Sequence, residues 1–201
     1  MATNLSRLFR GIEALYGADS GLDPDALLVP SEAGVREQLL LRETDDGELE
    51  VGLALDEETL RAVQDADVHD ALSDARLGET LPVLEGLSHL VYVAEAARRE
   101  KPISGLELET QAEVDKLAVV LMHRWGDARA QFEPLVDRLY YGFEMVAEAG
   151  LVERYERANR VALAFSRHLR APVHAGRLDE VRRRLLRFWQ GSMGDKLALA
   201  A

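Results

Sequence analysis

Apolar residues recur at spacings of three and four along most of the chain, first in residues 5–16 and then from residue 80 onward. This spacing places them on one face of a helix. Ser104 and Glu107 match a capping box, and Gly150 is a typical helix stop. The pattern predicts long helices at 80–99, 104–125, 133–149, 151–169 and 178–190.

One segment alternates with a period of two instead. Residues 48–55 place Leu49, Val51, Leu53 and Leu55 between polar or small residues, after a related run at 37–44 and an Asp-Gly turn. This arrangement predicts a β-hairpin. An isolated hairpin is only marginally stable, so we expect its leucines to pack on helices. Asp56 then predicts the start of a short helix ending near residue 63.

These elements together predict a mainly α fold, an antiparallel helical bundle of about five longer helices with a small β-hairpin in the N-terminal third. Short connections favour antiparallel neighbours. We expect residues 1–79 to hold the first helix, the hairpin and a connecting segment, and residues 80–201 to form the bundle. A chain of 201 residues suits one compact domain made of both parts.

The net charge of −12 is unevenly distributed along the chain. Residues 151–190 contain ten arginines and four acidic residues, for a charge of +6, so residues 1–150 carry −18. An acidic body repels nucleic acid and anionic membranes. We therefore expect the arginine-rich end to dock on the acidic body. No apolar run is long enough for a membrane span or a secretory signal, which predicts a cytoplasmic protein without membrane contact.

Several classes of chemistry lack their usual residues. The chain has no cysteine, which excludes disulfides, thiolate metal sites and cysteine nucleophiles. It also lacks a glycine-rich phosphate loop, a His-Glu-x-x-His pair and a Gly-x-Ser-x-Gly elbow. These absences favour a non-enzymatic role without deciding whether the protein is an enzyme.

One group of residues has the spacing of a metal or acid–base site. Glu85 and His89 are four residues apart on one expected helix, and Glu109 and Glu113 repeat that spacing on the next. If the two faces meet, the four side chains could hold a divalent metal. The competing interpretation is favoured, in which the first pair belongs to a solvated stripe or a structural polar network and the second pair consists of surface charges. That stripe contains Glu85, Ser88, His89, Tyr92, Glu95 and Arg99.

The final long helix presents a second candidate surface. Arg182, Arg183 and Arg187 lie close to Trp189, and arginine binds phosphate and carboxylate groups in a bidentate manner. These four residues are the candidates for binding a partner. RNA binding would also require exposed aromatic rings for stacking, and the acidic body opposes it.

Three functional hypotheses follow. The leading one is a non-enzymatic helical module, or a subunit of a cytoplasmic assembly, that binds another protein or itself as a homo-oligomer. The hairpin edge and the last amphipathic helix are its expected contact elements. The alternative is a carboxylate and histidine metal-binding or acid–base enzyme centred on the helices 80–100 and 104–125. The third hypothesis is an arginine-mediated binder of RNA or a phosphorylated ligand.

Overall fold

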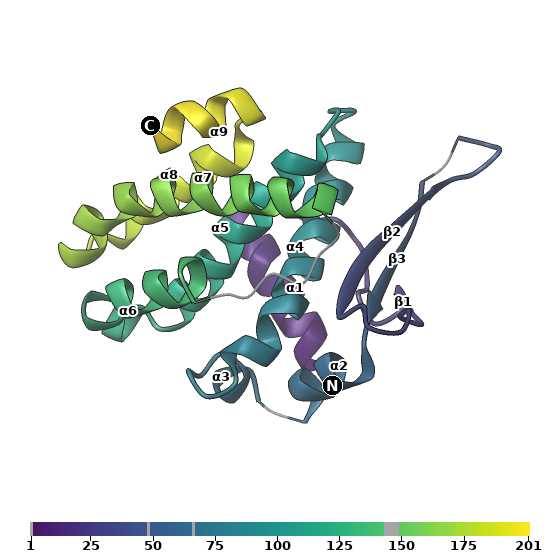
Figure 1. The fold of residues 1–201 in the computed structure, drawn as a ribbon, viewed down its shortest axis with the longest axis horizontal. Helices are drawn as coiled ribbons and strands as arrows, with labels where there is room; N and C mark the ends of the chain where they lie inside the picture. Colours follow the sequence, from purple (N-terminus) through teal and green to yellow (C-terminus); the bar gives the residue numbers. More distant parts are fainter. Residues whose placement is uncertain (1, 48, 66, 143–148) are drawn as a thin grey trace. The chain divides into compact units, whose positions relative to one another are not determined.

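A computed structural model describes residues 2–47, 49–65, 67–142 and 149–201. Within these ranges the fold is mainly α with one small sheet, as the sequence predicts (Figure 1). The chain forms two compact units, Met1–Glu95 and Ala96–Ala201, here called the first and second units. The boundary between them falls in the last turn of a long helix. No described helix is long and apolar enough to cross a membrane.

The first unit contains a three-stranded sheet of order β1-β3-β2. Its strands are β1 (Leu28–Val29), β2 (Glu37–Glu43) and β3 (Leu49–Leu55). β2 and β3 are antiparallel, with Leu39 opposite Leu53 and Leu41 opposite Val51, so the predicted hairpin is confirmed. β1 pairs with β3 in parallel and lies in a segment for which the sequence pattern predicts no element. Two residues are too few to show an alternating pattern.

Four helices complete the first unit. They are α1 (Asn4–Tyr16), α2 (Glu57–Gln64), α3 (Val68–Ala71) and α4 (Leu77–Arg98). Asp56 accepts a hydrogen bond from the backbone N–H of Thr59, which confirms it as the cap of α2. α4 begins before residue 80, where the pattern predicts its start, so Thr80 lies inside the helix and does not cap it. The Thr80 hydroxyl donates instead to the carbonyl of Ala71 at 2.7 Å, and this bond ties α4 to α3.

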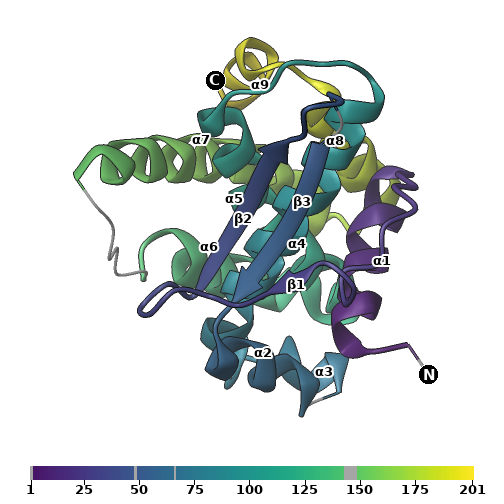
Figure 2. The same ribbon diagram turned by 90° about the vertical axis from the view of Figure 1, so that its right-hand side faces the viewer.

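The sheet lies against α4 (Figure 2). A Cβ added to Gly86 would lie 2.6 Å from Leu53 Cδ1 and 2.9 Å from Glu37 Cγ. Both distances are shorter than real Cβ contacts, so a residue without a side chain is required at this crossing. Leu53, Ala54 and Leu55 at this end of β3 are buried. The prediction that the hairpin packs on a helix is therefore confirmed for its base.

The second unit consists of helices. They are α5 (Gly105–His123), the 3-10 turn η1 (Trp125–Asp127), α6 (Ala128–Tyr140), α7 (Ala149–His174), α8 (Leu178–Gln190) and α9 (Met193–Ala200). α7 packs against α5, α6, α8 and α9, so it is the central element. Phe132, Phe165, Leu169 and Phe188 are among the core residues.

α7 continues past the point where the sequence predicts its end. The missing N–H of Pro172 leaves the carbonyl four residues earlier without its helical donor. That carbonyl belongs to His168, and it accepts a hydrogen bond from Arg184 Nη1 of α8 at 2.8 Å. A side chain from the next helix thus replaces the lost backbone bond. The expected stop before Pro172 is wrong for this reason.

The boundaries of α6 and α9 also differ from the predictions. α6 begins at Ala128 and ends at Tyr140, whereas the pattern predicts a helix over 133–149 whose last part reaches residues 143–148, outside the described ranges. α9 follows the last predicted helix, 178–190, in a segment for which the pattern predicts no element. Ser192 and Asp195 form a reciprocal capping box at its start, and Lys196 follows in its first turn. Ser104 caps α5 through the N–H of Glu107.

Candidate functional site

The four residues proposed for a metal or acid–base site are divided between the units. Glu85 and His89 lie one turn apart on α4 in the first unit, while Glu109 and Glu113 lie one turn apart on α5 in the second. The shared site therefore stays a prediction. Within each unit the structure shows what these side chains contact, and those contacts bear on the chemistry open to them.

His89 lies in the interior, with 5% of its surface exposed. Its Nδ1 is 3.6 Å from Glu37 Oε1 of β2, a distance that permits an ion pair when the imidazole is protonated. Ser88, Tyr92 and Glu95 of the same predicted stripe are also buried. The interpretation of this stripe as a solvated face is wrong for these residues. A sequence pattern cannot show that a polar stripe lies in the interior.

Glu109 and Glu113 are buried as well, and both have cationic partners inside the second unit. Arg154 Nη2 of α7 lies 3.2 Å from Glu109 Oε1, and Lys116 Nζ donates to Glu113 Oε1 at 2.5 Å. The expectation that they are surface charges is wrong. A metal ion at either carboxylate would have to compete with the existing cation, and removing that cation would leave a buried charge uncompensated.

The arginine-rich helices pair partly with acidic residues of the preceding region, as expected. Arg170 Nη2 lies 2.6 Å from Glu133 Oε2 of α6, and Arg154 pairs with Glu109. Arg184 contacts Glu180 within α8. These pairs account for part of the positive charge of α7 and α8 inside the second unit.

The candidate partner-binding residues of α8 are located on two different sides. Arg182, Arg183 and Arg187 are exposed. Trp189 is only 3% exposed and belongs to the core with Phe188. A ligand could reach the three guanidinium groups, but the indole is not available for stacking. The partner-binding role of this helix stays a prediction.

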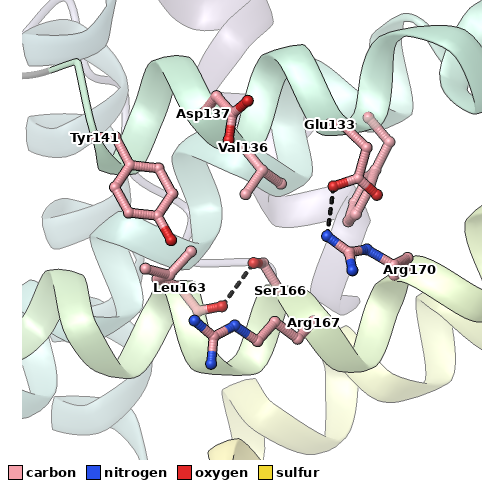
Figure 3. A pocket seen from close by; sticks show the side chains of 9 residues that line it. Glu133, Val136, Asp137, Tyr141, Leu163, Ser166, Arg167 and Arg170 are labelled. Carbon is pink, nitrogen blue, oxygen red and sulfur yellow. Dashed lines mark hydrogen bonds and ion pairs between the residues drawn. The ribbon is translucent and has the colours of Figure 1, made fainter.

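A small pocket lies between α6 and α7 in the second unit (Figure 3). Glu133 lines this pocket and contacts both Arg170, another lining residue, and His174, and the hydrogen bond from Arg170 is the main reason that the pKa of Glu133 is lowered. The Ser166 hydroxyl donates to the backbone carbonyl of Leu163 at 2.7 Å. Its proton is therefore engaged by the backbone rather than by a base, which argues against a serine nucleophile.

The second unit also buries a lysine. Lys196 of α9 has no exposed surface, and its Nζ donates to Gln111 Oε1 at 2.5 Å and to the Phe188 carbonyl at 2.8 Å. Gln111 in turn donates to Asp115 at 2.7 Å. Burial lowers the pKa of Lys196 to about 7. Sequence reasoning missed this residue, because nothing local distinguishes one lysine in an alanine-rich terminus.

The hairpin of the first unit carries the clearest exposed apolar surface. Leu41 and Leu49 are 49% and 45% exposed, and Leu40 on the opposite face is 42% exposed. We call residues 40–47 and 49–51 the hairpin tip. Sequence reasoning named the hairpin edge as a contact element, but it did not name Leu40 or Leu41, and its expectation that Leu49 packs on a helix is wrong. The three consecutive leucines at 39–41 were the available signal, since a strand covered on one face only needs alternate leucines.

Comparison with known proteins adds no assignment, because no family model, curated protein or solved structure matches this chain.

Proposed function

We propose that this chain is a non-enzymatic protein–protein interaction module and that the hairpin tip is its contact surface. The observation that carries the proposal is the exposure of Leu41 and Leu49 on the same sheet face as the buried Leu53. This face carries apolar residues from base to tip, with Glu37 and Glu43 at the two ends of β2, and only its base is covered by the first unit.

The register of the hairpin shows why the face is continuous. Leu39 is opposite Leu53, Leu41 is opposite Val51, and Glu43 is opposite Leu49. Paired residues in an antiparallel ladder point to the same side. Gly86 of α4 approaches this side at Leu53. Toward the turn, the apolar row continues while the exposure of its leucines rises.

Covering these leucines would be favourable. Full burial of a leucine side chain contributes about 1.5–3 kcal/mol, so covering the exposed halves of Leu41 and Leu49 contributes about 1 kcal/mol each. Leu40 would add a similar amount if the partner reaches the other face. A contiguous exposed apolar surface commonly marks an interaction site.

The two other functional classes have less support. The acid–base hypothesis needs carboxylates that are free to exchange protons or bind a metal, whereas Glu109 and Glu113 are engaged with Arg154 and Lys116. The hypothesis of an arginine-mediated RNA binder relies on Trp189 as a stacking platform, and that side chain is buried. A cytoplasmic location and self-association remain proposals.

The test places a photoreactive benzoylphenylalanine at position 41 or 49, with position 197 as the matched control. Leu197 is 38% exposed on α9 and lies outside the hairpin. A protein captured in native lysate from the hairpin positions alone is then purified and titrated against three forms of the chain. We expect Leu41→Ser with Leu49→Ser to raise its Kd at least tenfold and Leu197→Ser to leave it unchanged.

Two results would contradict the proposal. One is equal capture from positions 41, 49 and 197, which would indicate nonspecific labelling. The other is an unchanged Kd for the doubly substituted chain, which would place the contact elsewhere. A melting curve of each variant, followed by circular dichroism, separates loss of contact from loss of fold.

A further inference from the structure

The open edge of β2 offers backbone groups as well as leucines. Among the described residues β2 pairs with β3 alone, because the sheet order is β1-β3-β2. The backbone N–H of Asp56 donates to the carbonyl of Arg36, which identifies these two opposed residues as a hydrogen-bonded pair. Such pairs alternate along an antiparallel ladder. The N–H and C=O groups of Leu39, Leu41 and Glu43 therefore point away from β3.

An edge of this kind is a template for another strand. Natural sheets blunt exposed edges with proline, bulges or inward-pointing charges. β2 pairs with β3 residue for residue from Glu37 to Glu43 without a bulge, it contains no proline, and its inward-pointing charge, Glu37, lies at the base of the strand beside His89. Its outer half presents leucines on both faces. Strand addition combines such main-chain hydrogen bonds with contacts to alternate side chains.

The negative charge around the edge of β2 favours a basic strand as its partner. Residues 37–55 hold six acidic residues and one arginine, a net charge of −5. The arginine, Arg42, is paired across the hairpin with Glu50. Glu43, Asp45 and Asp46 near the turn are exposed. The first unit as a whole contains 21 acidic residues and six arginines, a net charge of −15.

We infer that the edge of β2 binds an extended, basic segment of a partner protein as a fourth strand of the sheet. The inference rests on the proposed function and specifies its partner. The segment carries apolar residues at alternate positions, facing Leu39 and Leu41, and a lysine or arginine facing Glu43.

A second copy of the chain fits this edge less well. If two β2 strands pair antiparallel about a twofold axis perpendicular to the sheet, each residue lies opposite a residue of the other copy whose side chain points to the same face. The axis therefore passes between one residue and the same residue of the other copy. With the axis at Leu40, Glu37 meets Glu43 of the other copy, and with the axis at Leu39, Arg36 meets Arg42. Like charges directly opposite each other are destabilising. Both arrangements also bring two hairpins of charge −5 together.

The probe for this inference is a blocked peptide, Lys-Thr-Val-Thr-Val-Thr-Lys. Its binding to the full chain is followed by amide NMR at low salt, together with a version in which glutamate replaces lysine. We expect slowed hydrogen exchange at the N–H groups of Leu39, Leu41 and Glu43. We also expect at least tenfold weaker binding of the glutamate peptide. That difference should shrink as salt is added, because exposed charges are screened.

Two N-methylated versions of the lysine peptide test the backbone pairing. Each blocks one of the two alternate sets of N–H groups, and only one set can face β2. We expect one version to lose binding at least tenfold and the other to retain it. Equal binding by both would overturn strand addition, while capture of a partner at positions 41 and 49 would still support the interaction function.

Substitutions in β2 provide the matching test from the protein side. Leu41→Pro removes an N–H that points away from β3, so every hydrogen bond between β2 and β3 keeps its donor. Leu41→Ala shortens the side chain but keeps that N–H. We expect Leu41→Pro to bind the lysine peptide more weakly than Leu41→Ala. No binding of the lysine peptide by the unsubstituted chain would overturn the inference, and a dimer that forms through β2 would identify a second copy as the occupant instead.

Discussion

The leucines of the hairpin tip in the first unit are exposed, whereas Lys196 in the second unit is buried. The tip exposes about half of Leu41 and Leu49, although leucine is usually buried. Lys196 is fully buried, although lysine is almost always exposed. The hairpin extends beyond the point where α4 meets it, so its outer leucines have no cover from that helix. Lys196 has hydrogen-bond acceptors in the core, namely Gln111 Oε1 and the Phe188 carbonyl. Whether a side chain is buried therefore depends on the groups that neighbouring elements place around it rather than on its residue type.

The comparison also separates surface that serves the fold from surface that is free for binding. Lys196 connects α9 to Gln111 of α5 and to the Phe188 carbonyl of α8, so three helices depend on one side chain. Leu49 lies opposite Glu43 in the ladder and is largely in solvent. Substitutions at these two places should thus differ strongly in their effect on stability.

The largest effect is expected for Lys196→Ala. It leaves the acceptors on Gln111 and Phe188 without their donor and creates a cavity, which should lower the free energy of unfolding of the second unit by about 3 kcal/mol. Urea denaturation followed by circular dichroism measures it. Lys196→Met is the matched control, because it fills the space without a charge and should cost less. A loss below about 1 kcal/mol for alanine would show that Lys196 is not buried in solution.

A smaller effect is expected where the hairpin base meets α4. Alanine favours a helix over glycine by about 1 kcal/mol, yet a Cβ at position 86 would press on Leu53 and Glu37. We expect Gly86→Ala to destabilise the first unit by about 2 kcal/mol through overpacking. Leu49→Ser at the exposed tip is the control and should change stability by less than about 0.5 kcal/mol. A Gly86→Ala variant that is more stable than the unsubstituted chain would contradict the close approach of the sheet to α4 at this position.

The third prediction concerns pH. The pKa of Lys196 is lowered to about 7 in the fold, while lysine in an unfolded chain has a pKa of about 10.4. Between these values the unfolded chain binds more protons, so stability rises with pH through this window and levels off below pH 7. We expect a gain of about 1 kcal/mol for the second unit between pH 7.5 and 8.5.

Lys196→Met supplies the reference for that pH series, because it removes the titrating group and retains most of the volume. The difference in unfolding free energy between the two proteins should grow steadily over the window. Parallel curves for both proteins would assign the pH dependence to other groups. Tyr140 contributes little between pH 7.5 and 8.5, because the usual pKa of a tyrosine hydroxyl lies above this range and burial raises it further.

Much of the secondary structure was predictable because its signals are local. The capping residues Asp56 and Ser104 accept the expected backbone hydrogen bonds, and the alternation of β3 predicts the hairpin. The end of α7 was not predictable, because Arg184 replaces the hydrogen bond lost at Pro172 only after α8 has folded back. α9 has a local start signal in the capping box of Ser192 and Asp195 that sequence reasoning did not use, whereas the burial of its lysine depends on residues far away in sequence.

The candidate site divides in the same way. Helical spacing correctly places Glu85 and His89 on one face of α4, because a period of 3.6 residues is a property of the backbone. The spacing does not reveal that His89 is buried beside Glu37 of a strand. That contact joins residues 52 positions apart, and it exists only because Gly86 lets the sheet approach the helix.

The sequence by itself determined the mainly α character, the β-hairpin and the acidic charge of the first unit, because periodicity, turn residues and side-chain ionisation are local properties. The tertiary structure decided which polar groups are buried and which leucines stay exposed. Burial depends on what a second element places opposite each side chain, and for Leu41 and Lys196 the outcome is the reverse of what their hydropathy alone would predict.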